Sequence, residues 1–295
     1  MIHTVIFSKD RACQCDLCLR SLFHNDTINA FDKISVIYAA STQYFKQGYE
    51  LLQRRWNKMV DFVWQDEYDS FKDATVATVD DCHTYMMFMV DDNIMYREFP
   101  SYPEEYLLEK NIKTLLNNLF TKCGYMNLGC FSLRLGRNTV IQDPYLKTRT
   151  EFPREYASDL SNVFMMWDWT QVNPWHNFGY PLSLDATIFQ VNTILPILQD
   201  IDYNNPNSLE GALQSQRDKL PRYMGCFQQS LVVNTPLNRV QDTCKNRAGE
   251  YFPADAKYLN EQFLQGKRIL LGDIDFSNIV GCHQELQVQL CNTTF

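Results

Sequence analysis

Apolar and polar stretches alternate along the first third of the chain in a way that predicts strands separated by helices. Short apolar runs predict strands at 3–8, 34–39, 62–64 and 85–90, and longer amphipathic segments predict helices at 14–23, 47–58 and 72–83. Strands that alternate with helices form parallel sheets with right-handed crossovers. The first third therefore predicts an α/β fold.

The pattern changes after residue 93. We expect helices at 104–123, 186–199, 208–219 and 256–264, and short strands at 131–135 and 230–234. Between them, residues 164–180 are rich in aromatic side chains. No Gly/Ser-rich linker and no internal repeat divides the chain, so residues 1–295 are expected to form a single domain.

The end of the apolar strand at 85–90 carries the clearest chemical signal, because Asp91, Asp92 and Asn93 follow it directly. Two adjacent ionised carboxylates repel each other, and burying them unpaired is costly. A cation would relieve that cost, and open α/β sheets bind ligands outside the carboxyl ends of their strands. Mg²⁺ and Mn²⁺ prefer oxygen ligands, usually one or two carboxylates plus substrate phosphates. The alternative is a solvated turn, where Asp and Asn are common.

Composition narrows the function classes. The net charge of the 295 residues is −8, which argues against a general nucleic-acid binder, because the phosphate backbone attracts basic surfaces. We expect no integral membrane segment and a cytoplasmic protein, because no apolar run is long enough for a bilayer and the N-terminal one is too short for a signal peptide. The ten cysteines are then expected to be reduced, and Cys15-x-x-Cys18 lacks the second pair that a zinc site needs.

Four further segments hold candidate chemistry. Residues 8–11 connect the first expected strand to the first expected helix. At the start of a helix they can bind phosphates or cap the helix. Asp185 and Glu210 stand at two expected helix starts, with Ser208 as the N-cap before Glu210. Each acid can stabilise the helix dipole or face an acceptor hydroxyl, with Glu210 as a general base. His283, in a polar loop, gains meaning only where it completes a metal site.

Taken in order, residues 8–11, Asp91-Asp92-Asn93 and the late acid at a helix start resemble a nucleotide-sugar glycosyltransferase of the GT-A fold. Segments 132–136, 180–185, 238–241 and 259–266 resemble those of small bacterial and viral family-2-like transferases. The resemblance implies a mixed, mostly parallel central sheet flanked by helices. It also implies a Rossmann-like nucleotide-sugar-binding half at 1–95 and an acceptor-binding, catalytic half at 96–295.

The resemblance also assigns roles to single residues. It places Ser8, Arg11, Tyr38, Ala39, Asp66, Lys72, Asp91 and Asp92 around the nucleotide. Asp92, Asn93 and His283 would hold Mn²⁺ or Mg²⁺, although Asn93 stands where the family motif ends in Asp. Glu210 would deprotonate the acceptor, and Asp185 would be the second catalytic acid. Five rings would either stack on the acceptor or form the core beneath it: Trp167, Trp169, Trp175, Phe178 and Tyr180.

The implied activity is inverting, metal-dependent transfer of a sugar from a nucleotide diphosphate sugar, with UDP favoured, to a hydroxyl of a glycan acceptor. A second copy of the chain, in a homodimer, is a further expected partner. Two alternatives stay open. One is a catalytically degenerate GT-A-like protein that binds nucleotides or glycans. The other is a sugar nucleotidyltransferase, although its triphosphate site would call for a glycine-rich loop that residues 8–11 do not provide.

Overall fold

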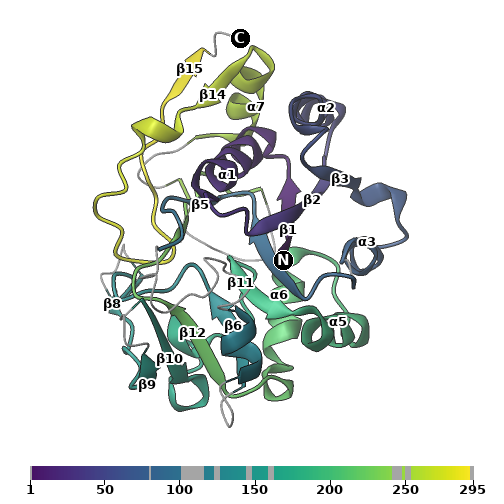
Figure 1. Cartoon of the computed structure of the whole chain (residues 1–295). Coiled ribbons are helices and arrows are strands. Elements are labelled where there is room, and N and C mark those ends of the chain that lie inside the picture. Colours follow the sequence, from purple (N-terminus) through teal and green to yellow (C-terminus); the bar gives the residue numbers. More distant parts are fainter. Residues whose placement is uncertain are drawn as a thin grey trace.

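The computed structural model describes residues 2–79, 81–100, 116–122, 127–143, 148–158, 163–240, 248–249 and 254–292. Within these ranges a nine-stranded sheet runs through the molecule, with helices packed on it (Figure 1). Its strand order is β3-β2-β1-β4-β11-β6-β12-β10-β9. The strands are β1 (Ile2–Lys9), β2 (Phe31–Ala39), β3 (Asp61–Trp64), β4 (Tyr85–Val90), β6 (Leu128–Ser132), β9 (Glu155–Ser158), β10 (Phe164–Asp168), β11 (Thr187–Gln190) and β12 (Tyr223–Phe227).

Strand direction confirms the expected α/β class with a mixed, mostly parallel sheet. β3, β2, β1 and β4 are mutually parallel, and β11 runs antiparallel between β4 and β6. β12 is parallel to β6, while β10 is antiparallel to both β12 and β9. Among the strands described, only β11 and β10 therefore oppose β1. Short pairs add β5 (Asn93–Met95) to β13 (Val232–Asn234), β14 (Lys267–Ile269) to β15 (Leu290–Asn292), and β7 (Ile141–Asp143) to β8 (Thr148–Arg149).

Helices cover both faces of the parallel strands. One face packs against α1 (Ala12–Asn25), α2 (Gln43–Trp56) and α7 (Ala256–Leu264), and the other against α3 (Phe71–Thr78), α5 (Val191–Asp200) and α6 (Pro206–Gln214). In β4, Met87 lies in the first apolar cluster and Phe88 in the second, so its alternate side chains face opposite layers. This double burial explains why β4 is a continuous apolar run. Short helical turns are η1 (Gln65–Glu67), η3 (Asn118–Lys122), η4 (Trp169–Gln171), η5 (Asn177–Gly179), η6 (Arg217–Lys219) and η7 (Leu271–Asp273).

The helix expected at 186–199 is wrong in its first part. Thr187–Gln190 is strand β11, and α5 begins only at Val191. Ile188 and Phe189 are fully buried, because β11 lies between β4 and β6 and both neighbouring strands cover it. No glycine or proline separates β11 from the start of α5, so the sequence carries no turn signal that divides the strand from the helix.

The helix expected at 208–219 begins earlier and ends earlier. Asn205 is the N-cap of α6, Pro206 follows it, and Ser208 completes a capping box as the third helical residue. Ser208 is therefore not the N-cap, and Glu210 lies beyond the first turn, where the helix dipole acts less on it. Some other bounds also shift: α3 ends at Thr78, and the strand expected at 131–135 is β6 at 128–132. Most of the helix expected at 104–123 lies outside the described residues.

The C-terminal segment packs beside the N-terminal helices. α7 has the predicted bounds, and the Asp255 side chain caps it by accepting from Tyr258 N. In Figure 1, α7 and the β14–β15 pair lie next to α1 at the end of the molecule that carries the C-terminus. No helix in the described ranges is both long and apolar enough to span a bilayer.

Candidate functional site

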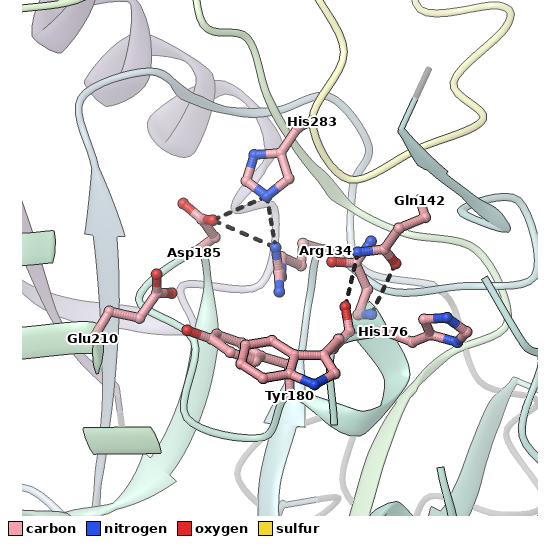
Figure 2. Close-up of a pocket in the computed structure, with 9 residues that line it drawn as sticks. Arg134, Gln142, His176, Tyr180, Asp185, Glu210 and His283 are labelled. Carbon is pink, nitrogen blue, oxygen red and sulfur yellow. Dashed lines mark hydrogen bonds and ion pairs between the residues drawn. The ribbon is translucent and has the colours of Figure 1, made fainter. Parts of the chain in front are cut away.

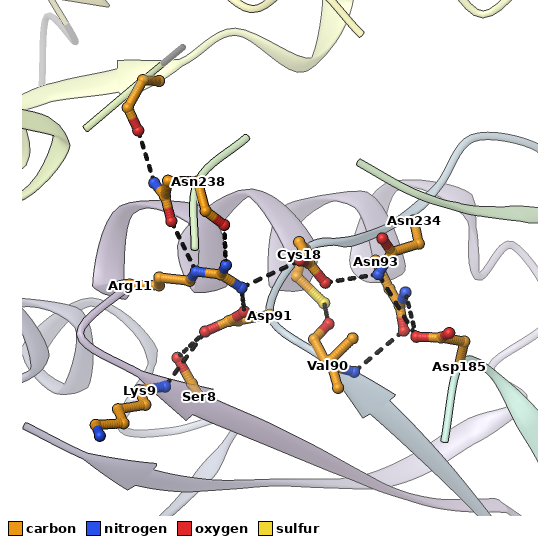
Figure 3. A network of polar contacts seen from close by, with 12 residues as sticks. Ser8, Lys9, Arg11, Cys18, Val90, Asp91, Asn93, Asp185, Asn234 and Asn238 are labelled. Carbon is orange, nitrogen blue, oxygen red and sulfur yellow. Dashed lines mark hydrogen bonds and ion pairs between the residues drawn. The ribbon is translucent and has the colours of Figure 1, made fainter. Parts of the chain in front are cut away.

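The carboxyl ends of β1 and β4 meet at a buried carboxylate (Figure 3). Asp91 Oδ2 accepts from Ser8 Oγ at 2.8 Å and from Lys9 N at 3.3 Å. Its Oδ1 accepts from Arg11 Nη1 at 2.9 Å. We call Ser8, Lys9, Arg11 and Asp91 the Asp91 corner. Ser8 and Lys9 end β1, Arg11 follows in the β1–α1 loop, and each of them contacts Asp91 just after β4, so the corner fixes the two central strands against each other.

Arg11 bridges the two adjacent aspartates. Its Nη1 also lies 3.1 Å from Asp92 Oδ2, and its Nε donates to Asn238 Oδ1 at 2.8 Å. Burial alone would lower the pKa of Arg11, but the carboxylates of Asp91 and Asp92 outweigh it and raise that pKa. The guanidinium is therefore a permanent cation at the place where the sequence predicted a metal.

Asp92 is less well compensated than its neighbour. Its Oδ1 accepts from Asn234 Nδ2 at 2.6 Å. Burial, together with the carboxylates of Asp91 and Asp185, raises the pKa of Asp92 to about 7 against the opposing charge of Arg11. A carboxyl with such a pKa gains from any cation that a ligand brings.

Asn93 and His283 reach the same place from different segments. Asn93 pairs with Asn234 in the β5–β13 ladder, and His283 forms the next bridge to Asn234. The Asn93 side chain is fully buried: its Oδ1 accepts from Val90 N at 3.1 Å, and its Nδ2 donates to Asp185 Oδ1 at 3.1 Å (Figure 3). Asn93 thus holds the β4–β5 turn and orients Asp185.

A cavity of about 220 Å³ opens beside this network (Figure 2). Its lining comes from segments far apart in the sequence: Arg134, Gln142, Trp175, His176, Asn177, Tyr180, Asp185, Glu210 and His283. This volume is below the roughly 300–1,000 Å³ of pockets for drug-sized ligands, so it suits one small polar ring or part of a longer ligand.

Arg134 organises the inner wall of the cavity. Its Nη1 lies 3.4 Å from Asp185 Oδ2 and 3.0 Å from His283 Nε2, and His283 Nε2 is 3.7 Å from Asp185 Oδ2. Because an arginine only donates, His283 Nε2 accepts, and the imidazole is neutral with its proton on Nδ1. Burial and Arg134 lower the pKa of His283 against the opposing carboxylate of Asp185, in agreement with a neutral ring.

Glu210 projects from α6 to the cavity next to Asp185 (Figure 2). The hydrogen bonds that described residues give it, from Ser183 Oγ and Leu184 N at 3.1 Å each, both end on Oε1. Burial and the carboxylate of Asp185 raise the pKa of Glu210, and Arg134 opposes the shift. A carboxylate with a raised pKa and one uncommitted oxygen has the properties of a general base.

The net charge of the site favours a divalent cation, whereas the positions of its side chains do not provide a complete set of metal ligands. Its four acids are Asp91, Asp92, Asp185 and Glu210, and within the described residues the guanidinium groups of Arg11 and Arg134 oppose their charges. When all four acids are ionised, two negative charges are left over within this set, which matches one divalent ion. Among the described residues, however, no three His, Cys, Asp or Glu side chains gather closely enough to hold a metal by themselves. Substrate phosphates would have to supply the remaining ligands.

The other nucleotide-site candidates lie at varying distances from this centre. Ala39 O accepts from Asp10 N at 3.2 Å, at the end of β2. The Tyr38 ring packs on that of Tyr49, whose hydroxyl lies 2.6 Å from Ser8 Oγ. Two predicted residues stand apart from this network. Asp66 is exposed in η1, and Lys72 Nζ lies 3.7 Å from Asp202 Oδ1.

Sequence reasoning missed several cavity residues, and it left the aromatic stretch undecided. Arg134 is the one charged residue within 131–135, which is a usable signal, while nothing in the sequence marks Gln142 or Asn177 as cavity residues. Of the five rings, Trp167, Trp169 and Phe178 are buried in the core, and Tyr180 and Trp175 line the cavity.

Comparisons with known proteins give one informative relative. No family model matches the chain. A protein described as bifunctional glycosyltransferase pgtA, from Dictyostelium discoideum, is 28% identical over an alignment of 276 residues that covers 83% of this chain and 33% of that protein. The chain thus spans about a third of its curated relative's length. The apo crystal structure of mouse xyloside xylosyltransferase 1 superposes over 74% of this chain and 76% of its own, with a TM-score of 0.30 and 10% identity, a likeness too loose to carry an argument.

Proposed function

We propose that this protein is a glycosyltransferase that moves a sugar from a nucleotide diphosphate sugar, with UDP favoured, to a hydroxyl of a glycan acceptor. One observation carries the proposal. A continuous polar network leads from the ends of β1 and β4, through Asp92 and Asp185, to a cavity that holds Glu210. The similarity to a bifunctional glycosyltransferase supports the same reading.

In this proposal the two parts of the network have different tasks. The ends of β1, β2 and β4 would bind the nucleotide, in the position where open α/β sheets bind such ligands. Arg11 donates from its guanidinium toward this edge and would face the donor's phosphates once they approach. The cavity beside it would bind the acceptor, so that the sugar to be transferred lies between the two.

Glu210 would act as the general base. Its uncommitted Oε2 would take the proton of the acceptor hydroxyl as that oxygen attacks the anomeric carbon and the bond to the diphosphate breaks. Ser183 and Leu184 fix the carboxylate by binding Oε1, which leaves one oxygen to react. Attack from the face opposite the leaving group inverts the anomeric centre. Asp185, held by Asn93 and Arg134, would orient the acceptor and keep Glu210 basic by its negative charge.

A divalent cation, Mn²⁺ or Mg²⁺, is part of the proposal. Asp92 and His283 are the residues that would hold it, with Asn93 positioning the carboxylate of Asp185 beside them. Such an ion would supply charge compensation for the departing diphosphate. The support is electrostatic: an anionic diphosphate could not enter a site with excess negative charge unless a cation came with it.

A catalytically degenerate nucleotide- or glycan-binding protein is the second candidate. The side chain of Asn93, which stands in the usual place of an acid, is buried and engaged with Val90 and Asp185. This candidate predicts nucleotide binding with no turnover of any sugar nucleotide.

Substitution of Glu210 separates the two candidates. Glu210→Gln should leave UDP binding unchanged and lower sugar transfer by roughly 10²- to 10⁴-fold, the usual contribution of a general base. The matched control is Glu261→Gln, the same change at an exposed position on α7, which should transfer at the wild-type rate. Wild-type transfer by Glu210→Gln would remove this residue from the mechanism. Nucleotide binding by a wild type that turns over no sugar nucleotide would favour the degenerate protein.

A further inference from the structure

Trp175 is unusually exposed to solvent for a large apolar side chain. It is 84% exposed, more than any other large apolar side chain in the described ranges, whereas Trp167 and Trp169 are buried. Trp175 is also one of the residues that line the cavity. A large ring left in water at the rim of a pocket is typical of a binding surface rather than of a core residue.

The backbone on both sides of Trp175 is held firmly. Trp175 N donates to Asn173 Oδ1 at 3.0 Å, and Trp175 O accepts from Gln142 Nε2 at 3.2 Å. His176 N donates to Asn173 O at 2.9 Å. A Cβ at Gly179 would lie 2.2 Å from Asn173 O, so this tight turn requires glycine. The exposed ring is therefore presented by an ordered turn.

The cavity also leaves polar atoms without partners near this ring. Asn177 is 6% exposed, and its backbone N donates to Gln142 Oε1 at 3.0 Å. Its side-chain Nδ2 is buried and has no hydrogen-bond partner in the part of the chain that the structure describes. A buried unpaired donor is costly and is usually matched by a water or a ligand. Together with Glu210 Oε2, the cavity offers an apolar face at its rim and unpaired polar groups inside.

We propose that Trp175 and Asn177 form the subsite for a pyranose ring of the acceptor. A pyranose has the matching chemistry, because its axial C–H bonds form an apolar face and its hydroxyls lie at the ring edge. The C–H face would stack on the indole, and a hydroxyl would accept from Asn177 Nδ2. A cavity of about 220 Å³ has room for one such ring. The inference rests on the proposed function and deepens it, because it names the residues that would hold the sugar ring of the glycan acceptor.

The test uses methyl β-glycosides of glucose, galactose and N-acetylglucosamine as probes, with saturation-transfer NMR on the full chain. At least one probe should receive saturation from the wild type. Trp175→Ala should weaken binding of that probe roughly tenfold, and Trp175→Phe should keep part of it. Tyr258→Ala, which removes a 51% exposed ring on α7, is the matched control and should bind as the wild type does. Equal binding by Trp175→Ala, or no binding of any probe by the wild type, would overturn the subsite.

A second measurement separates this inference from the function on which it rests. UDP binding, followed by thermal shift with Mn²⁺, should be the same in the wild type, Trp175→Ala and Asn177→Leu. If UDP binds but no glycoside does, the acceptor subsite is wrong and the donor site stands. If a glycoside binds through Trp175 but no nucleotide does, the transferase proposal fails and a saccharide-binding site remains.

Discussion

The Asp91 corner and the cavity that Glu210 lines belong to one polar network, but they differ in how many of their polar atoms have hydrogen-bond partners. In the corner, the backbone of Lys9 and the side chains of Ser8 and Arg11 all donate to one carboxylate. In the cavity, Asn177 Nδ2 has no partner, and both hydrogen bonds to Glu210 end on the same oxygen. Buried groups that the chain itself satisfies hold the scaffold together, whereas groups left unsatisfied mark where a ligand is expected.

The largest difference between the two regions is expected when an acid is removed from each and both protein stability and sugar transfer are measured. Asp91→Ala should lower the free energy of unfolding by roughly 3–5 kcal/mol, because Ser8 Oγ, Lys9 N and Arg11 Nη1 lose the buried carboxylate that they share. Glu210→Gln should cost little stability, since burial already disfavours its charge, while transfer falls by orders of magnitude. Denaturant unfolding measures the first effect. An equal loss of stability in both variants would contradict the distinction.

Asp92 lies between the two regions, and its substitution should show how much an uncompensated buried charge destabilises the folded protein. Its pKa, raised to about 7, means that the folded protein binds a proton more tightly there than the unfolded chain does. Its contribution to stability is therefore present at low pH and is lost as the pH rises from about 4 to about 7. Asp92→Asn should raise the melting temperature at pH 8 by several degrees and much less at pH 5, while it abolishes stabilisation by Mn²⁺ with UDP.

Thermal melting at the two pH values checks this prediction. Arg11→Gln is an informative companion variant, because it removes the cation that opposes the shift and should destabilise the protein most at pH 8. A melting temperature for Asp92→Asn below that of the wild type at both pH values would show that Asp92 stabilises the fold, and that its charge is already compensated.

The pH dependence of transfer should come from Glu210. A general base must be deprotonated, so transfer should fall as the pH drops through the pKa of Glu210, which burial and Asp185 raise above its ordinary value. The residual transfer of Glu210→Gln should lack this acid limb. A rate profile from pH 4 to pH 9 at saturating donor tests both statements, and an unchanged acid limb in Glu210→Gln would assign it to another group.

The smallest effect is expected at Lys72. Its ammonium lies 3.7 Å from the exposed carboxylate of Asp202, a surface pair that adds little to stability. Lys72→Ala should leave the melting temperature within error of the wild type. The same variant tests whether Lys72 contacts the nucleotide, as the resemblance implies: that role predicts weaker UDP binding, measured by calorimetry, and unchanged affinity would restrict Lys72 to its surface pair.

The sequence predicts the first half of the fold better than the second, and the reason is physical. Parallel strands buried on both faces, such as β1 and β4, are short apolar runs bounded by polar turns, so they can be recognised one at a time. β11 is shorter, and α5 follows it directly with no glycine or proline between them, so only its pairing with β4 and β6 shows that it is a strand.

The sequence marked single candidate residues, Asp185, Glu210 and His283 among them, but it showed which residues lie together only where they are adjacent in the chain. Asp91 and Asp92 stand out because two acids follow an apolar strand. The cavity, in contrast, brings together residues 134, 177, 185, 210 and 283, which converge only in the folded protein. The role of Asn93 as a buried orienting amide likewise depends on Asp185, 92 positions further along the chain.

The proposed donor site is tested most directly by calorimetric titration of the wild type with UDP, GDP and CMP, each with and without Mn²⁺. We expect the wild type to bind one nucleotide, with UDP favoured, and only when Mn²⁺ is present. That binding should be lost in Asp92→Asn and kept in Glu210→Gln, so that it maps to the strand-end acids and not to the cavity base. Binding of no nucleotide under any condition would contradict the donor site, and with it the proposal that this chain transfers sugars.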